Sequence, residues 1–117
     1  MRTVGITANL PVTDLAAAES FYRGFLGLRD EEFSLGWVAR CTDPATGLHV
    51  QLVTRDATAP EDSVLTVRTD DVEAAHAEAV AAGYEIVHPL TLEPWGVRRF
   101  FVRDPSGNVL DIAQHSG

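Results

Sequence analysis

The chain has 117 residues, 45% of them hydrophobic and 22% charged, which predicts one folded domain and not a disordered chain. The formal net charge is −8 and all nine basic residues are arginines, which argues against nucleic-acid binding because phosphate recognition needs clustered positive charge. Cys41 is the only cysteine, so an intramolecular disulfide is excluded, and no stretch approaches the roughly 20 apolar residues of a membrane span. We therefore expect a cytoplasmic protein without nucleic-acid or membrane partners, in which Cys41 is a small buried residue.

The first half of the sequence predicts one strand, one helix and three more strands. Apolar and polar residues alternate over residues 3–12, which predicts a strand with Thr7 and Asn9 on one face. Helical spacing over residues 15–26, which would place Phe21, Tyr22 and Phe25 in the core, follows a possible N-cap at Asp14 and ends at Gly27. Further strands are predicted over residues 28–34, 37–42 and 49–54.

The same order of elements begins again after a charged linker at residues 55–62. A strand is predicted over residues 64–68, and a helix capped by Asp70 or Asp71 runs through residue 82. A strand over residues 84–88 is followed by a loop that contains Pro89, Pro94, Trp95 and Gly96.

The chain closes with a predicted hairpin over residues 97–114. Its turn, Asp104-Pro105-Ser106-Gly107, has Pro where φ must be near −65° and Gly where φ is positive. A similar turn ends at Gly47, and aligning Gly47 with Gly107 places Gln51 opposite Asp111. Together with the recurring helix caps, this repeat predicts an α+β domain of two βαβββ modules, about residues 1–55 and 63–117.

Each module would have one strand face covered by its helix. Leu65, Val67, Leu110 and Ile112 alternate onto the face that we expect the second helix to cover. We expect the opposite faces to line a cleft within a curved mixed sheet. The residues predicted on that lining are Thr7, Asn9, His49, Gln51, Val64, Thr66, Arg68 and Asp111.

Two segments carry a resemblance to a known family. Leu10-Pro11-Val12-Thr13-Asp14-Leu15, with the following helix, and Asp104-Pro105-Ser106-Gly107-Asn108-Val109-Leu110-Asp111 resemble the vicinal oxygen chelate superfamily. That superfamily includes glyoxalase I, extradiol dioxygenases, fosfomycin-modifying transferases and bleomycin-resistance proteins. The resemblance implies the paired-module fold and a homodimer.

The resemblance also implies where a metal ion would bind in the enzymes of this superfamily, which use the first and last strand of each module. Those positions correspond here to Thr7, Val64, Gln51 and Asp111. Only Asp111 is a good metal ligand, and a transition-metal site generally needs three or more. We therefore predict no metal, no cofactor and no catalytic residue, and we keep a metal site centred on His49 as an alternative.

Without a metal, the chain most resembles the bleomycin-resistance proteins, which sequester a drug. The segments Leu35-Gly36-Trp37-Val38 and Pro94-Trp95-Gly96 resemble that subgroup. Aromatic side chains provide surfaces on which a planar ring stacks, and an acidic protein favours a cationic guest. The predicted ligand-binding residues are Phe33, Trp37, His49, Gln51, Trp95, Phe101 and Asp111.

Several assignments stay open. Trp37 is equally explained as a core residue, and either Arg98 or Arg99 faces inward. The alternatives to a small-molecule binding protein are a metal-dependent lyase, isomerase or dioxygenase with atypical ligands, and a regulatory subunit whose cleft is occluded.

Overall fold

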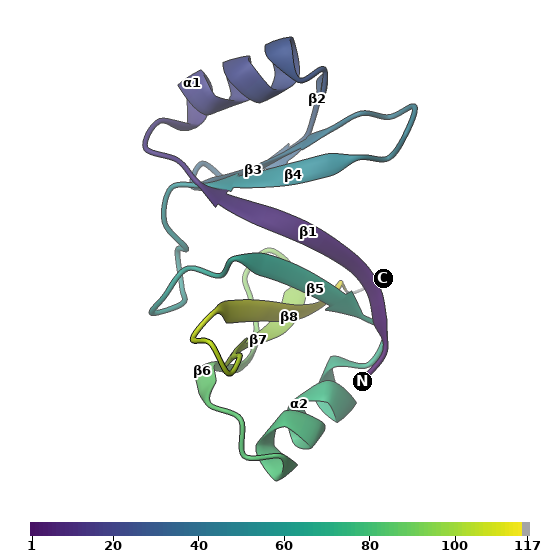
Figure 1. Ribbon diagram of the computed structural model, residues 1–117, viewed down its shortest axis with the longest axis vertical. Helices are drawn as coiled ribbons and strands as arrows, with labels where there is room; N and C mark the ends of the chain where they lie inside the picture. Colours follow the sequence, from purple (N-terminus) through teal and green to yellow (C-terminus); the bar gives the residue numbers. More distant parts are fainter. Residues whose placement is uncertain (116–117) are drawn as a thin grey trace. The chain divides into compact units, whose positions relative to one another are not determined.

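The computed structural model describes residues 1–115, and its chain forms two compact units (Figure 1). We call residues 7–58 the N-terminal unit, and residues 1–6 with residues 59 onward the C-terminal unit. The first strand, β1, runs from one unit into the other, since its residues up to Ile6 belong to the C-terminal unit. The predicted module boundary, in contrast, assigned all of this strand to the first module.

The N-terminal unit follows the predicted order of one strand, one helical segment and three strands. Its strands lie in the order β2-β3-β4-β1, with β1 parallel to β4 and the other pairs antiparallel. The elements are β1 (Thr3–Pro11), α1 (Leu15–Glu19), η1 (Ser20–Phe25), β2 (Asp30–Ser34), β3 (Val38–Thr42) and β4 (His49–Val53).

The C-terminal unit repeats this arrangement. Its strands lie in the order β5-β8-β7-β6, with β5 parallel to β8 and the other pairs antiparallel. The elements are β5 (Leu65–Thr69), α2 (Val72–Ala81), β6 (Ile86–Leu92), β7 (Val97–Arg103) and β8 (Val109–His115). The prediction of two βαβββ modules in an α+β fold is therefore confirmed. Among residues 1–115, no helix is long and apolar enough to cross a bilayer.

The first predicted helix differs from expectation in its second half. Asp14 caps α1 by accepting a hydrogen bond from the Ala17 N–H (3.0 Å), but residues Ser20–Phe25 form a π-helix. A π-helix has i→i+5 hydrogen bonds, such as Leu26 N–H to Phe21 O, so this segment does not keep the α-helical periodicity on which the prediction was based. Phe21 and Phe25 are 52% and 80% exposed, and the prediction that both belong to the core is wrong.

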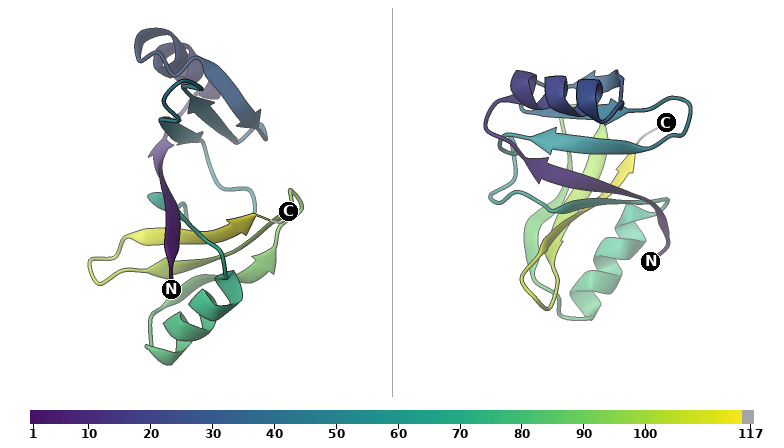
Figure 2. Two further views of the ribbon diagram at one scale, coloured as in Figure 1. Left: turned by 90° about the vertical axis from the view of Figure 1, so that its right-hand side faces the viewer. Right: turned by 45° about the horizontal axis from the view of Figure 1, so that its top comes forward.

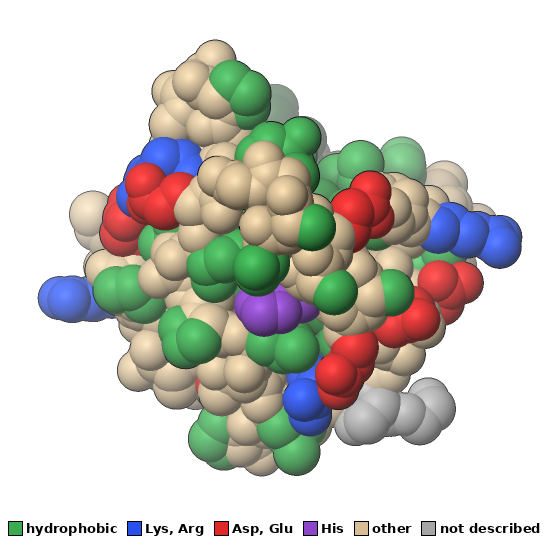
Figure 3. Space-filling view, turned by 90° about the horizontal axis from the view of Figure 1, so that it is seen from below, with side chains coloured by type: hydrophobic (Ala, Val, Ile, Leu, Met, Phe, Trp, Pro, Cys, Tyr) green, Lys and Arg blue, Asp and Glu red, His purple; other side chains and the backbone are tan. Residues whose placement is uncertain are grey.

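A hydrophobic core lies between α2 and the sheet of the C-terminal unit (Figure 2). Phe100 is 1% exposed and packs with Val67, Val72 and Ile112. The predicted assignment of strand faces in this module is confirmed. Seen from below, the surface shows hydrophobic side chains around a histidine, with acidic side chains on both sides of them (Figure 3).

The core of the N-terminal unit is centred on Cys41, Val50 and Leu52. Cys41 is fully buried, as predicted, and burial raises the pKa of its thiol. The nearby Glu19 carboxyl also has a raised pKa, first because of burial and then because of a hydrogen bond and charge repulsion from Glu31. These shifts keep both groups in their neutral forms to higher pH, as expected beside a core.

The strand predicted to end at His88 continues through Pro89, because β6 spans Ile86–Leu92. Proline lacks a backbone N–H and is tolerated in edge strands and at bulges. Here β6 is the edge strand of its sheet, and its pairing with β7 is irregular between His88 and Thr91. The predicted loop therefore begins later in the chain.

The final hairpin has the predicted turn, in which Gly107 adopts a φ of 91° and donates to Asp104 O. The pKa of the Asp104 carboxyl is lowered, first by the Asn108 side chain (Nδ2 to Oδ2, 2.9 Å) and then by the backbone N–H of Asn108. Ser106 donates through its backbone N–H only, at 2.9 Å from Oδ1.

We expect Asn108→Ala to raise the pKa of Asp104 toward its ordinary value, because the hydrogen bond that lowers this pKa most is lost. A lowered folded-state pKa contributes stability above the unfolded-state pKa, and this contribution disappears as the pH falls below about 4. An NMR titration of the carboxyl carbon measures the shift. Ser106→Ala keeps its backbone N–H and serves as the control; an equal shift in that variant would contradict the assigned cause.

Candidate functional site

In the N-terminal unit, strand pairing places four side chains on the sheet face opposite the helical segment. Gln51 on β4 pairs with Asn9 on β1 and with Arg40 on β3, and Arg40 pairs with Phe33 on β2. Paired residues share a face, so these side chains adjoin each other. Cys41 lies on the other face, in the core under α1.

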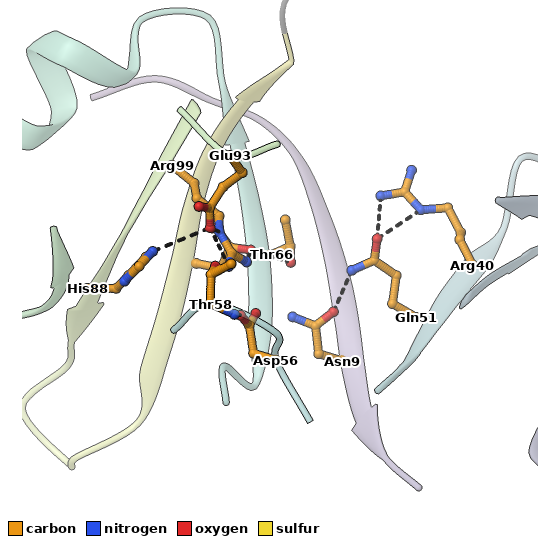
Figure 4. A network of polar contacts seen from close by, with 10 residues as sticks. Asn9, Arg40, Gln51, Asp56, Thr58, Thr66, His88, Glu93 and Arg99 are labelled. Carbon is orange, nitrogen blue, oxygen red and sulfur yellow. Dashed lines mark hydrogen bonds and ion pairs between the residues drawn. The ribbon is translucent and has the colours of Figure 1, made fainter. Parts of the chain in front are cut away.

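These side chains form a hydrogen-bonded set, drawn in part in Figure 4. Gln51 Nε2 donates to Asn9 Oδ1 (2.6 Å), and Gln51 Oε1 accepts from Arg40 Nε (3.2 Å) and Nη2 (2.8 Å). Arg40 Nη1 also donates to Glu32 Oε2 (3.1 Å), and the guanidinium lies 5.3 Å from the centre of the Phe33 ring. We call Asn9, Glu32, Arg40 and Gln51 the N-terminal polar cluster.

His49 lies on the same face, where both ring nitrogens have partners. Nδ1 is 2.9 Å from the Gly47 carbonyl oxygen, which can only accept, so Nδ1 carries the proton. In the neutral ring Nε2 then accepts from the Thr7 hydroxyl at 2.7 Å. The lone pair that would coordinate a metal is therefore engaged by Thr7.

In the C-terminal unit, pairing brings a second set of side chains to the face opposite α2. Asp111 on β8 pairs with Thr66 on β5 and with Phe101 on β7, and Phe101 pairs with His88 on β6. Arg99 lies two residues before Phe101, so its side chain points to the same face.

Within this set, Glu93 lies beside Arg99, and His88 reaches the same carboxylate (Figure 4). Glu93 Oε2 lies 2.7 Å from both Nε and Nη2 of Arg99, and Asp111 Oδ2 lies 3.5 Å from Nη1. His88 Nε2 is 3.4 Å from the same Glu93 oxygen, and Thr66 Oγ1 donates to Asp111 Oδ2 at 3.3 Å. All five residues are buried. We call Thr66, His88, Glu93, Arg99 and Asp111 the C-terminal polar cluster.

Two aromatic rings flank the Arg99 guanidinium. Its carbon lies 5.0 Å from the Trp95 ring centre and 4.7 Å from that of Phe101, within the range of cation–π contacts. Phe101 is fully buried and also meets His88 edge to face at 5.4 Å. Trp95 is only half-buried, so a ligand at this cluster would meet its indole first.

The predicted ligand-binding residues thus fall into separate groups. Phe33, His49 and Gln51 share a face in the N-terminal unit, and Trp95, Phe101 and Asp111 adjoin one another in the C-terminal unit. Trp37 lies in the N-terminal unit directly before β3, where its backbone carbonyl accepts from the Thr54 N–H at 2.9 Å.

Three residues of the C-terminal polar cluster were not predicted: His88, Glu93 and Arg99. Alternation from Asp111 through its partner Phe101 would have placed Arg99 on the inner face, leaving Arg98 to pair with Glu73 on α2. His88 is predicted at the end of a strand, and His49 is the only histidine predicted on the cleft lining. No local signal identifies Glu93, which lies between two strands and reaches Arg99 only in the folded unit.

The positions at which the resemblance implies a metal ion hold residues that do not fit a divalent ion. By strand register, Asn9 and Thr66, and not Thr7 and Val64, lie level with Gln51 and Asp111. Two amides and a hydroxyl are weak neutral donors. Gln51 and Asp111 each contact an arginine, and among residues 1–115 no group of three His, Cys, Asp or Glu side chains is arranged to hold a metal.

Several solved structures are similar to this one. The structure is similar to that of a Legionella pneumophila protein described as an NAD-dependent benzaldehyde dehydrogenase (TM-score 0.77, 20% identity, covering 96% of this chain and 100% of that chain). It is also similar to methylmalonyl-CoA epimerase from Mycobacterium tuberculosis (TM-score 0.73, 20% identity, 98% and 90%). A third similar structure is a glyoxalase/bleomycin resistance protein/dioxygenase superfamily member from Vibrio splendidus 12B01 (TM-score 0.69, 19% identity, 94% and 97%).

At these identities the similarity concerns the fold alone. Among curated proteins, no sequence matches the chain significantly. Residues 4–112 match the family model named Glyoxalase/Bleomycin resistance protein/Dioxygenase superfamily. The chain therefore belongs to the glyoxalase/bleomycin resistance protein/dioxygenase superfamily.

Proposed function

We propose that this protein binds and sequesters a small planar, cationic organic molecule of the antibiotic type, without a metal ion and without converting it. The proposal depends on the contacts of Gln51 and Asp111, the two residues at positions where related enzymes hold their metal. Each is held by an arginine, and each arginine lies against an aromatic ring. Such a site offers rings, charges and hydrogen bonds but lacks a metal-ligand set.

The charges of the C-terminal polar cluster favour a cation. Glu93 and Asp111 carry two negative charges against the single positive charge of Arg99, and the whole chain has a net charge of −8. The half-buried Trp95 adds a ring on which a planar guest can stack. A flat cation would therefore gain both charge attraction and stacking at one place.

Two alternatives make different predictions. A metal-dependent isomerase is suggested by the similarity to methylmalonyl-CoA epimerase, and it would require a bound divalent ion. A regulatory subunit with an occluded site would bind no small molecule. We further propose that the protein acts in the cytoplasm, where its buried Cys41 stays reduced, and that it forms a homodimer, which would cover the exposed Phe21 and Phe25.

Titration of the wild-type protein with bleomycin and other planar cationic antibiotics should quench tryptophan fluorescence in a saturable manner. We expect Trp95→Ala to weaken the affinity at least tenfold, as removal of a central aromatic contact generally costs about 2 kcal/mol or more. Trp37→Ala serves as the control and should keep the affinity, since Trp37 belongs to the N-terminal unit and not to the C-terminal polar cluster.

Calorimetry of the same titrations and metal analysis of protein purified without chelators complete the experiment, and sedimentation velocity tests the homodimer. Stoichiometric metal in the purified protein would favour the enzyme. Absence of both quenching and heat with every compound would favour the occluded subunit. Equal losses of affinity in the two variants would contradict the role of Trp95.

A further inference from the structure

The C-terminal polar cluster contains a guanidinium that contacts two carboxylates, one of which is also contacted by a histidine. We infer that Arg99 is the built-in cation of this site: it takes the place of a divalent metal ion among His88, Glu93 and Asp111, and it excludes that ion. This inference rests on the metal-free function proposed above, and it names Arg99 as the residue that keeps a metal ion out.

The contacts place Arg99 between the two carboxylates. Nε and Nη2 face Glu93 Oε2 at 2.7 Å, whereas Nη1 faces Asp111 Oδ2 at 3.5 Å. His88 Nε2 approaches the same Glu93 oxygen at 3.4 Å. The guanidinium therefore occupies the space into which carboxylate oxygens from two different segments converge.

Charge explains why a cation is needed there. The Glu93 and Asp111 side chains are 2% and 10% exposed, and burying two carboxylates without a compensating positive charge is very costly. An arginine satisfies this need at every accessible pH, because it does not lose its proton in proteins. A metal ion would satisfy it only when the ion is available.

The chemistry of the guanidinium also explains the exclusion. Arginine has five N–H donors and no lone pair to offer, so it cannot ligate a metal, and it engages the carboxylate oxygens that a metal would bind. The contacts with the rings of Trp95 and Phe101 hold the planar group in place. With Arg99 present, the His and carboxylate groups among residues 1–115 do not meet in a metal-binding geometry.

The N-terminal unit contains the same combination in a more exposed form. Arg40 contacts an acid, Glu32, and the closing-strand residue Gln51, and it lies near the Phe33 ring. An arginine, an acid, an aromatic ring and the polar residue of the closing strand thus occur together in each unit. This repetition indicates that the arginine is part of the site and not an isolated ion pair.

Titration with Co²⁺ alone tests the inference, because Co²⁺ reports its ligands through its visible spectrum. We expect Arg99→Ala to bind one Co²⁺ per chain about 100-fold more tightly than the wild type, in line with the effect of key site residues on metal affinity. Arg99→Lys, which keeps the positive charge, should bind as weakly as the wild type. The double variant Arg99→Ala/Asp111→Asn should lose the gain.

Arg98→Ala is the matched control for removal of an arginine, since Arg98 pairs with Glu73 outside the cluster, and it should not bind Co²⁺. If Arg99→Ala does not fold in the absence of metal, both Arg99→Ala and Arg99→Gln are refolded with Co²⁺ and without it. Folding only with Co²⁺ supports the inference, and no folding in either condition contradicts it.

A folded Arg99→Ala variant that binds Co²⁺ no better than the wild type would overturn the role of Arg99 and leave the metal-free function standing. Stoichiometric metal in the purified wild type would instead overturn the metal-free function, whatever the variant does. The two failures are therefore distinguishable.

Discussion

Glu93→Ala is expected to lower the free energy of unfolding by about 3–5 kcal/mol, because it leaves the Arg99 guanidinium buried beside a single carboxylate. Glu93 Oε2 is the acceptor for two Arg99 nitrogens at 2.7 Å, and the Glu93 side chain is almost completely buried. Hydrogen bonds between ionised partners are stronger than those between neutral groups. In the variant, the Arg99 guanidinium cannot reach water without disrupting the site. Urea unfolding followed by circular dichroism measures the change.

Glu32→Ala provides the matched control, because Glu32 is the acid that contacts the corresponding arginine of the other unit. Its side chain is 46% exposed, and exposed ion pairs contribute only about 0–1 kcal/mol. A loss for Glu93→Ala that does not exceed that for Glu32→Ala would show that the C-terminal polar cluster is hydrated and that its ion pairs are weak.

Phe100→Ala is expected to destabilise the protein by about 3–5 kcal/mol, because it removes the largest side chain of the core beneath α2. Phe100 is 1% exposed and packs with Val72 and Ile112, and the His76 ring meets it edge to face at 5.0 Å. The cavity would lie between helix and sheet, so hydrogen exchange in α2 should accelerate together with the drop in unfolding free energy.

Tyr84→Ala controls for loss of an aromatic side chain from the same unit. Tyr84 is 57% exposed, and surface substitutions generally change stability by less than about 0.5 kcal/mol. If both variants lost similar stability, the core beneath α2 would not be the main source of stability in this unit.

Local chemistry in the sequence determined where the elements begin and end. Asp14 and Asp71 cap the helices, and the glycine at position 107 adopts the positive φ that its turn requires. Alternation along β5 and β8 correctly separated the helix-covered face from the polar face, because side chains in a strand have a strict period of two. These features depend on near neighbours in the chain, so the order of two βαβββ modules could be predicted.

Tertiary structure alone decided how the C-terminal polar cluster is assembled. Strand register brings Asp111 on β8 close to Arg99 on β7, whereas Glu93, between β6 and β7, reaches Arg99 only in the folded unit. The helical prediction likewise missed that residues Ser20–Phe25 form a π-helix and that Phe25 is 80% exposed, because neither follows from apolar spacing. The sequence determined which residues share a face, but only packing determined which buried charges meet, because a charge takes the nearest partner that the fold provides.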